Sequence, residues 1–475
     1  MRSEAQARPV VRPARWPAGA AEWRQRWGRM ARGLAGAMDG LRRWGRVPRV
    51  LAGAVGMLVA LLVSVVVRAA GPLPAVGPGD QGFAQVLGPR TFEFPQDHGA
   101  HPEYRQEWWY FTGNLESPAG ERFGFELTIF RFGLAPGEVG SAGTGVGASA
   151  QPSVRPDVGA KIEAGSDTQS AWRTRQMYMA HFAVTDVGRQ RFRFAEKVSR
   201  GGAIGLAGAR NPPLKVWMDD WVLEDAGVVG GAGTRDFGHW KLHAAEPGYE
   251  LTLDVEALLA PVLNGEHGFS AKSGTPGAAS YYYSIPRTAV HGQLVRDGKT
   301  LEVRGLAWMD REWGSGSLSK QQQGWDWFAL QTRDGGSLMF YALRDNDGRR
   351  DPHSAGTWVT AAGEARPLKS DDVQIEVLDY WKNPRGERYP ARWHVRVPAV
   401  GVDVEVRPAL ADQELITGSS RYWEGAVDVV EAGVSGAAAR DGGGRREAVR
   451  QSAGDAVATK AAGRGYVELV GYSAQ

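Results

Sequence analysis

Short segments in which apolar and polar residues alternate restrict the fold of this 475-residue chain more than any other feature. Alternation with period two occurs in residues 123–129 (FGFELTI), 249–255 (YELTLDV) and 402–406 (VDVEV), and it is typical of strands with one buried face. The 64 glycines and 26 prolines, together with Asp-Gly turn signals between the segments, favour short strands joined by tight turns. No segment after residue 70 combines helical periodicity with capping residues. We therefore expect an all-β fold, either a sandwich or a barrel.

Length and residue types limit the possible classes of function. At roughly 100–200 residues per domain, a chain of this length should form two or three domains. Cysteine is absent, which excludes thiol nucleophiles, thiolate metal sites and disulfides. The nine histidines show no metal-binding spacing, and we expect no metal and no other cofactor. The net charge of +3 combines a basic beginning with a mildly acidic remainder, a distribution that argues against nucleic-acid binding.

The first 67 residues have the pattern of a membrane anchor. Residues 1–49 contain twelve arginines and three acidic residues, and residues 50–67 (VLAGAVGMLVALLVSVVV) contain no charge. Eighteen residues of helix are about 27 Å long, close to the hydrocarbon thickness of a bilayer. The pattern predicts a basic cytoplasmic tail, a transmembrane signal-anchor at 50–67, and a single-pass inner-membrane protein whose body lies in the periplasm. The alternative is a cleaved signal peptide and a secreted body, but the charged region of a signal peptide is usually much shorter.

Composition divides the body of the chain into two parts. The Gly- and Ser-rich segment 270–279 separates two groups of strands of similar size, and a final strand is expected at 465–470. Two stretches rich in Gly, Ala and Ser lack the apolar residues needed to order themselves. We therefore expect a linker at 68–84, an N-terminal domain at 85–279 with a disordered insert at 135–170, and a C-terminal domain at 280–475 with a disordered insert at 432–463.

Acidic residues among tryptophans are the clearest candidates for chemistry. They occur in Glu107-Trp108-Trp109-Tyr110, Asp219-Asp220-Trp221, Trp308-Met309-Asp310-Arg311-Glu312-Trp313, Trp325-Asp326-Trp327-Phe328 and Tyr422-Trp423-Glu424. A carboxyl packed against indole rings loses hydration, which raises its pKa and can keep it protonated as a general acid. For any single pair the more common arrangement is an acid that points to solvent while the ring packs inward. In the third motif, however, Trp308, Asp310 and Glu312 share one face, so that a buried Trp308 implies a buried Asp310 and an Arg311 that faces the other way.

Several motifs resemble those of the AttH / carotenoid 1,2-hydratase family, whose members are often labelled predicted secreted hydrolases. The resemblance runs from about residue 90 to the C-terminus. It is carried by His101-x5-Glu107-Trp108-Trp109-Tyr110-x-Thr112-Gly113-Asn114-Leu115, Phe123-Gly-Phe125, Tyr178-Met-Ala-His181-Phe182, Asp219-Asp220-Trp221, Ser280-Tyr281-Tyr282-Tyr283-Ser284 and Trp308-x-Asp310-Arg311-Glu312-Trp313. It implies two lipocalin-like antiparallel β-barrels in tandem, and export from the cytoplasm.

The resemblance also implies a chemistry on hydrophobic molecules. In the carotenoid hydratases an Asp is thought to protonate an isoprenoid double bond, while aromatic and His side chains stabilise the cation. Asp310 matches that Asp, Trp308 stands where the hydratases place a Tyr, and Tyr281 and Tyr283 fall near their His-x-Trp pair. The expected catalytic residues are Asp310, Trp308, Tyr281 and Tyr283, and the expected ligand-binding residues are Trp313, Glu312, Trp108, Trp109, Trp221 and His181.

Three functions remain open from the sequence. The first is a hydratase, a hydro-lyase that adds water to a C=C bond of an isoprenoid or lipid. The second is a non-catalytic lipid carrier or an accessory protein of an ABC-transporter permease, in which Asp310, Arg311 and Glu312 would form a structural cluster. The third, a hydrolase, rests on the family label, because no nucleophile–His–acid set is visible in the sequence.

Overall fold

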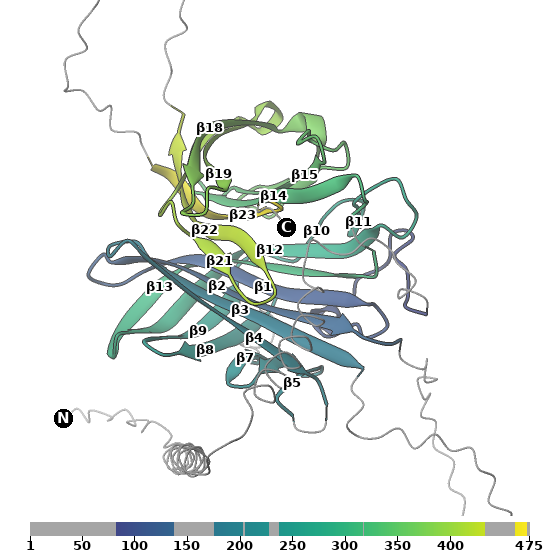
Figure 1. Cartoon of the computed structure of the whole chain (residues 1–475), viewed down its shortest axis with the longest axis horizontal. Coiled ribbons are helices and arrows are strands. Elements are labelled where there is room, and N and C mark those ends of the chain that lie inside the picture. The colour runs from purple at the N-terminus through teal and green to yellow at the C-terminus, as the bar shows by residue number, and fades with distance from the viewer. Residues whose placement is uncertain are drawn as a thin grey trace, which may run out of the picture. The chain divides into compact units, whose positions relative to one another are not determined.

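The computed structural model describes residues 82–136, 175–202, 205–227, 237–316, 318–432 and 461–472 (Figure 1). These residues form strands and three short 3-10 helices, which confirms the predicted all-β fold. None of the helices within these ranges is long and apolar enough to cross a bilayer. The expected tail at 1–49, the expected anchor at 50–67 and most of the two expected inserts lie outside the described residues.

The first sheet contains thirteen antiparallel strands in the order β4-β3-β2-β1-β13-β12-β9-β8-β7-β6-β5, with β10 and β11 paired to β12. The sheet curves so strongly that β6, near one end, contacts β2, β3 and β4 at the other. The strands are β1 (Gln106–Glu116), β2 (Arg122–Gly133), β3 (Gln176–Asp186), β4 (Arg191–Arg200), β5 (Ala207–Arg210), β6 (Lys215–Met218), β7 (Trp221–Asp225), β8 (His239–Glu246), β9 (Tyr249–Ala257), β10 (Val262–Leu263), β11 (Phe269–Ala271), β12 (Ala279–Arg296) and β13 (Lys299–Gly314), preceded by the 3-10 helix η2 (Gln96–His98).

The second sheet contains ten antiparallel strands in the order β17-β16-β15-β14-β23-β22-β20-β19-β18, with β21 paired to β22. Its two end strands, β17 and β18, are joined by a short 3-10 helix, and Figure 1 shows how strongly this sheet curves. The elements are β14 (Gln322–Thr332), β15 (Ser337–Asp345), β16 (Ala355–Val359), β17 (Ala365–Lys369), η3 (Ser370–Asp372), β18 (Gln374–Lys382), β19 (Arg388–Val397), η4 (Pro398–Val400), β20 (Val402–Pro408), β21 (Glu414–Ile416), β22 (Arg421–Glu431) and β23 (Ala461–Val470).

The chain passes from the first sheet to the second between Gly314 and Gln322, later than the boundary expected at 279–280. Strands β12 and β13 pair with β9 and β1, so they belong to the first sheet. The Gly- and Ser-rich segment 270–279 lies within that sheet. The expected boundary differs because composition indicates where a turn lies but not which strand the next strand pairs with. The two sheets together are consistent with two tandem barrels, although all described residues belong to one compact unit. The expected final strand is present as β23, and it lies between β14 and β22.

Strand β1 and the parts of β12 and β13 beside it, residues 279–288 and 307–314, are buried on both faces. Trp109, Met309 and Trp313 pack into the core of the first sheet, and we call this side the interior face. Tyr110 and Trp308 pack instead with residues of the second sheet, and we call this side the inter-sheet face. The predicted parity of residues 308–313 is therefore confirmed, and each of the two faces can hold its own set of polar groups.

Candidate functional site

The inter-sheet face carries a buried carboxyl group, that of Asp310. Its direct neighbour across the hairpin is Ser284, whose Oγ donates a hydrogen bond to Oδ1 at 2.5 Å. The Tyr282 hydroxyl donates to Oδ2 at 2.6 Å, and Trp308 Nε1 donates to Oδ1 at 2.7 Å. From the second sheet, Trp327 Nε1 donates to the Tyr282 hydroxyl at 3.1 Å. We call Asp310, Tyr282, Ser284, Trp308 and Trp327 the acid site.

The electrostatic setting of Asp310 suits proton transfer. The residue is 3% exposed, and no ion pair links it to any residue in the described part of the chain. Burial raises the pKa of Asp310 to about 7, although the three hydrogen bonds oppose the shift. A carboxyl with this pKa exchanges readily between its protonated and charged forms near neutral pH, so it can act as general acid or general base.

Glu312, two residues further along β13, has a different role. Lys272 Nζ lies 3.1 Å from Glu312 Oε1, and the Ser280 hydroxyl donates to the same carboxylate. The ammonium group also lies 4.2 Å from the centre of the Tyr341 ring. Glu312 is thus compensated by a cation, whereas Asp310 contacts only neutral donors, so that of the two groups Asp310 has the environment better suited to proton transfer.

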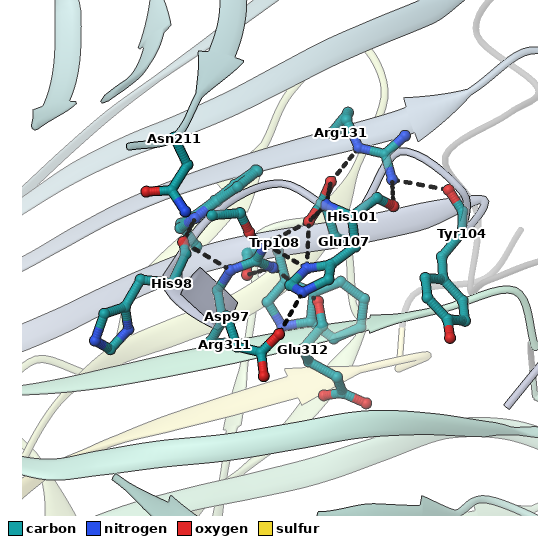
Figure 2. Close-up of polar contacts among 12 residues, drawn as sticks. Asp97, His98, His101, Tyr104, Glu107, Trp108, Arg131, Asn211, Arg311 and Glu312 are labelled. Atoms are coloured by element: carbon teal, nitrogen blue, oxygen red, sulfur yellow. Dashed lines mark hydrogen bonds and ion pairs between the residues drawn. The ribbon is translucent and has the colours of Figure 1, made fainter. Parts of the chain in front are cut away.

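The interior face carries a second cluster, which we call the interior network: Asp97, His98, His101, Glu107, Arg131 and Arg311. Figure 2 shows it around Glu107, which forms ion pairs with both Arg131 and Arg311. The His101 amide donates to both Glu107 oxygens at 3.1 and 3.0 Å. Although burial opposes the shift, the two guanidinium groups hold the pKa of Glu107 far below its ordinary value.

The interior network fastens the segment that precedes β1 to the first sheet. Arg131 donates to the carbonyls of His101 and Tyr104, both at 2.8 Å. The His101 ring stacks on Trp313 with centroids 3.9 Å apart, and His98 Nδ1 lies 2.7 Å from the Tyr283 hydroxyl. Because its carboxylates and guanidiniums are charged and mutually paired, this network is suited to holding structure rather than to moving protons.

The structure divides the sequence-predicted residues between these places. Asp310, Trp308, Glu312 and Trp108 lie on the inter-sheet face, which brings together half of the expected catalytic group. Tyr281, Tyr283, Trp313 and Trp109 lie on the interior face. Trp221 packs against Phe182 in the first core, and His181 lies on β3, where Nδ1 is 2.6 Å from the Tyr422 hydroxyl of the second sheet.

The structure thus corrects the expectation that Tyr281 and Tyr283 lie beside Asp310, and the reason is a β-bulge. From the Asp297-Gly298 turn the hairpin runs in register to Thr288, and then one extra residue of β12 enters between Ile285 and Thr288. An uninterrupted hairpin would have kept Tyr281 and Tyr283 on the face of Asp310. A one-residue shift exchanges the faces to which the side chains of β12 point. Tyr282 and Ser284 therefore lie on the face of Asp310 in place of Tyr281 and Tyr283.

Sequence reasoning missed Tyr282, Ser284 and Trp327. The only available signal was Pro286, which cannot donate to a ladder and therefore favours a bulge within a long strand. Trp327 stands in one of the motifs of acidic and aromatic residues, but nothing in the sequence indicated its contact with Tyr282, which joins different sheets. Contacts of this kind depend on how sheets pack, which alternation alone does not specify.

Comparison with known proteins places the chain in a family. The AttH-like family model matches residues 85–151 and 154–472. A solved structure named for AttH, from Nitrosomonas europaea, is 29% identical, covers 82% of this chain and 100% of its own, and gives a TM-score of 0.62. Kievitone hydratase from Nectria haematococca is 12% identical over 82% of this chain and 98% of its own, with a TM-score of 0.49.

A curated relative matches a smaller part of the chain. The dehydratase asqC of Emericella nidulans is 22% identical over 196 residues, which is 40% of this chain and 54% of the relative. The chain thus spans about half the length of that relative. Because the family model matches most of the described residues of both sheets, the chain belongs to the AttH-like family.

Proposed function

We propose that this protein is a hydro-lyase that adds water to, or removes water from, a C=C bond of a hydrophobic small molecule at the acid site. The observation that carries the proposal is the Asp310 carboxyl, buried between the sheets and contacted by three neutral donors rather than by a cation. Such a group holds a proton near neutral pH in an apolar setting, which is what protonation of an alkene requires.

In the direction of hydration, the Asp310 O–H bond breaks as the alkene π electrons form a new C–H bond. The adjacent carbon becomes a cation, a water oxygen adds to it, and a proton of that water returns to the Asp310 carboxylate. Dehydration is the same sequence reversed. Tyr282, Ser284 and Trp308 hold the carboxyl in place and stabilise its charged form.

Aromatic rings around the carboxyl suit a cationic intermediate. The rings of Trp308 and Trp327 lie 6.2 Å apart in an edge-to-face arrangement, and Tyr110 packs edge-on against Trp327 at 5.2 Å. The π faces of such rings attract a cation while the surrounding apolar atoms exclude bulk water. An isoprenoid or a comparable apolar skeleton is the class of substrate that fits these rings.

The name of one relative supports the proposed reaction class. The partial match to a dehydratase agrees with elimination of water as the reaction class. The apolar run at 50–67 supports the further proposal that the body is held at a membrane, on the periplasmic side, where apolar substrates are concentrated.

The test is turnover by the full-length protein. Wild type and Asp310→Asn are incubated with an apolar extract of the host membranes, and products are analysed by mass spectrometry. We expect wild type alone to produce a species that differs from a consumed compound by the mass of one water molecule. Asp220→Asn, an exposed carboxyl of the first sheet, is the control and should keep the activity.

A different outcome would contradict the proposal. If wild type and Asp310→Asn both retain the same apolar compound unchanged, the protein is a carrier and Asp310 has a structural role. If Asp310→Asn converts the compound as fast as wild type does, the reaction takes place elsewhere.

A further inference from the structure

Two more carboxyl groups are buried between the sheets without a cationic partner. Glu126 on β2 and Glu424 on β22 are each 1% exposed. No ion pair involves either residue in the described ranges, in contrast to Glu107 and Glu312. The mechanism proposed above uses neither of them. Buried acids without compensation are costly unless they stay protonated or have a function.

Glu126 and Glu424 come from different sheets and form a pair. Each carboxyl group affects the pKa of the other, and Glu126 Oε2 has no hydrogen-bond partner in the described part of the chain. Burial raises the pKa of both groups. A carboxyl pair in such a place retains at least one shared proton near neutral pH.

A continuous line of hydrogen-bonding groups leads outward from this pair. The Tyr422 hydroxyl lies 3.2 Å from Glu126 Oε1 and 2.6 Å from His181 Nδ1. On the far side of the imidazole, His181 Nε2 lies 3.2 Å from Glu196 Oε2. Glu196 is on β4, the end strand of the first sheet, and its side chain is 12% exposed against 1% for His181.

The outer end of this line is held as a charged acceptor. Thr417 Oγ1 donates to Glu196 Oε2 at 2.7 Å, and the Ser419 hydroxyl donates to the same oxygen. Although burial raises it, the pKa of Glu196 is lowered overall by the hydrogen bonds from His181, Ser419 and Thr417. A protonated inner carboxyl and a charged outer carboxylate are thus joined through a hydroxyl and an imidazole.

We propose that Glu126, Tyr422, His181 and Glu196 form a proton relay between solvent and the buried Glu126–Glu424 pair. With Glu126 protonated, one hydrogen lies in each link: Glu126 donates to Tyr422, Tyr422 to His181 Nδ1, and His181 Nε2 to Glu196. In one outward transfer the O–H bonds of Glu126 and Tyr422 and the Nε2–H bond of His181 break. New bonds to hydrogen form at the Tyr422 oxygen, at His181 Nδ1 and at the Glu196 carboxylate. The negative charge then moves from Glu196 to Glu126, and Glu196 releases its proton to water.

The inner end of the relay lies beside the acid site. The Tyr110 hydroxyl donates to Glu424 Oε1 at 2.5 Å, and Tyr110 stands directly opposite Asp310 in the β1–β13 register. The relay could therefore reset protons at the acid site between turnovers, and only this last step rests on the proposed function. The relay itself rests on contacts that need no substrate.

The experiment follows the protonated carboxyl groups by time-resolved infrared absorption. The full-length protein is jumped from about pH 6 to about pH 10, which removes protons from buried acids. Glu126→Gln identifies the part of the signal that belongs to the pair. We expect Tyr422→Phe, which loses only a hydroxyl, to slow the loss of that signal by about tenfold or more while its final amplitude stays the same.

A second variant separates proton transfer from simple structural support. His181→Gln keeps an N–H donor toward Glu196 but cannot take up a proton on one side and release it on the other, and we expect the same slowing. His243→Gln is the control, because His243 Nδ1 contacts only the Thr252 hydroxyl, on β9. Its signal should decay at the wild-type rate.

Three results would overturn the relay. Glu126→Gln could leave the carboxyl signal unchanged, Tyr422→Phe and His181→Gln could both decay as fast as wild type, or Tyr422→Phe could change the amplitude without changing the rate. None of these readouts involves substrate. Failure of the relay is therefore distinguishable from failure of the hydro-lyase proposal.

Discussion

Three buried carboxyl groups on neighbouring strands lie in different electrostatic surroundings. Glu107 lies between two guanidinium groups, Glu312 lies beside an ammonium group, and Asp310 receives only neutral hydrogen bonds. In a site of low dielectric constant, the compensating charge determines which acid ionises. The guanidinium groups therefore keep Glu107 a carboxylate, and of the three groups Asp310 is the one whose pKa lies near neutrality.

Asp310 should make the protein less stable as the pH rises. Its pKa is about 7 in the folded protein against an ordinary value of 3.8, so the folded state binds more protons between these values. The free energy of unfolding should then fall from about pH 4 to about pH 7, by on the order of 1–4 kcal/mol. Asp310→Asn should remove this part of the slope. Urea unfolding across that range measures it, and parallel slopes for the two proteins would contradict the assignment.

Glu107 should show the opposite pH dependence. Its pKa is held below the unfolded value, so its contribution to stability is present above about pH 4.5 and is lost as the pH falls toward the folded pKa. Glu107→Gln leaves two guanidinium groups uncompensated and should destabilise the protein by about 3–5 kcal/mol at neutral pH. Chemical denaturation measures the loss. The exposed Glu103 provides the control, since Glu103→Gln should change stability by less than about 0.5 kcal/mol.

At the scale of elements, the hairpin β12–β13 sets the geometry of the acid site. Its register fixes Ser284 opposite Asp310, and the bulge before Thr288 decides which tyrosines share that face. Strand β13 is also packed tightly between β1 and β12. A Cβ added at Gly305 would meet the Asn114 carbonyl oxygen at 1.9 Å, so the backbone of β1 leaves no space for a side chain there.

Gly305→Ala should therefore destabilise the protein by about 1–3 kcal/mol, because the ladder between β1 and β13 must open to admit a methyl group. Thermal unfolding measures the effect. Gly274→Ala is the matched control, since a Cβ at Gly274 meets no atom within 4 Å. Equal melting temperatures for the two variants would show that β13 adjusts without cost.

The sequence predicts the strands well and their partners poorly. Alternation identifies β2, β9 and β20, and parity places Trp308 and Asp310 opposite to Arg311. The bulge in β12 is not visible as a change in polarity, because residues on both faces there are buried. The interior network could not be predicted from the sequence either, since Glu107 and Arg311 are 204 residues apart and meet only when β1 pairs with β13.

At the scale of the whole molecule, the two sheets depend on each other for burial. Tyr110 and Trp308 pack with Trp327 and Tyr341, and Asn114 Nδ2 donates to the Gly465 carbonyl at 3.0 Å. Separating the sheets would expose these aromatic rings to water and would leave the buried acids without their hydrogen-bond partners from the other sheet. The intact chain should therefore unfold the two sheets together rather than one after the other.

Residues 318–475, expressed alone, should not give a folded monomer. The fragment would expose the apolar face that carries Trp327, Tyr341 and Tyr466, and exposed patches of this kind promote association. Analytical ultracentrifugation and denaturant titration check the expectation. A monomeric fragment with a sharp unfolding transition would mean that the second sheet is an independent domain.

The burial of residues 307–314 of β13 on both faces has a consequence for how such a chain can change over time. Trp308, Asp310 and Glu312 face the second sheet and the proposed acid site, whereas Met309, Arg311 and Trp313 face the core of the first sheet. Neighbouring codons thus come under unrelated selection. Loss of a single residue between the β-bulge of β12 and the turn of the hairpin would exchange the faces of these two sets of residues. The Arg311 guanidinium would then lie between the sheets. Insertions or deletions that the fold tolerates in this hairpin should therefore be two residues long. The residue spacing along the hairpin should be conserved more strictly than the identities of most of its residues.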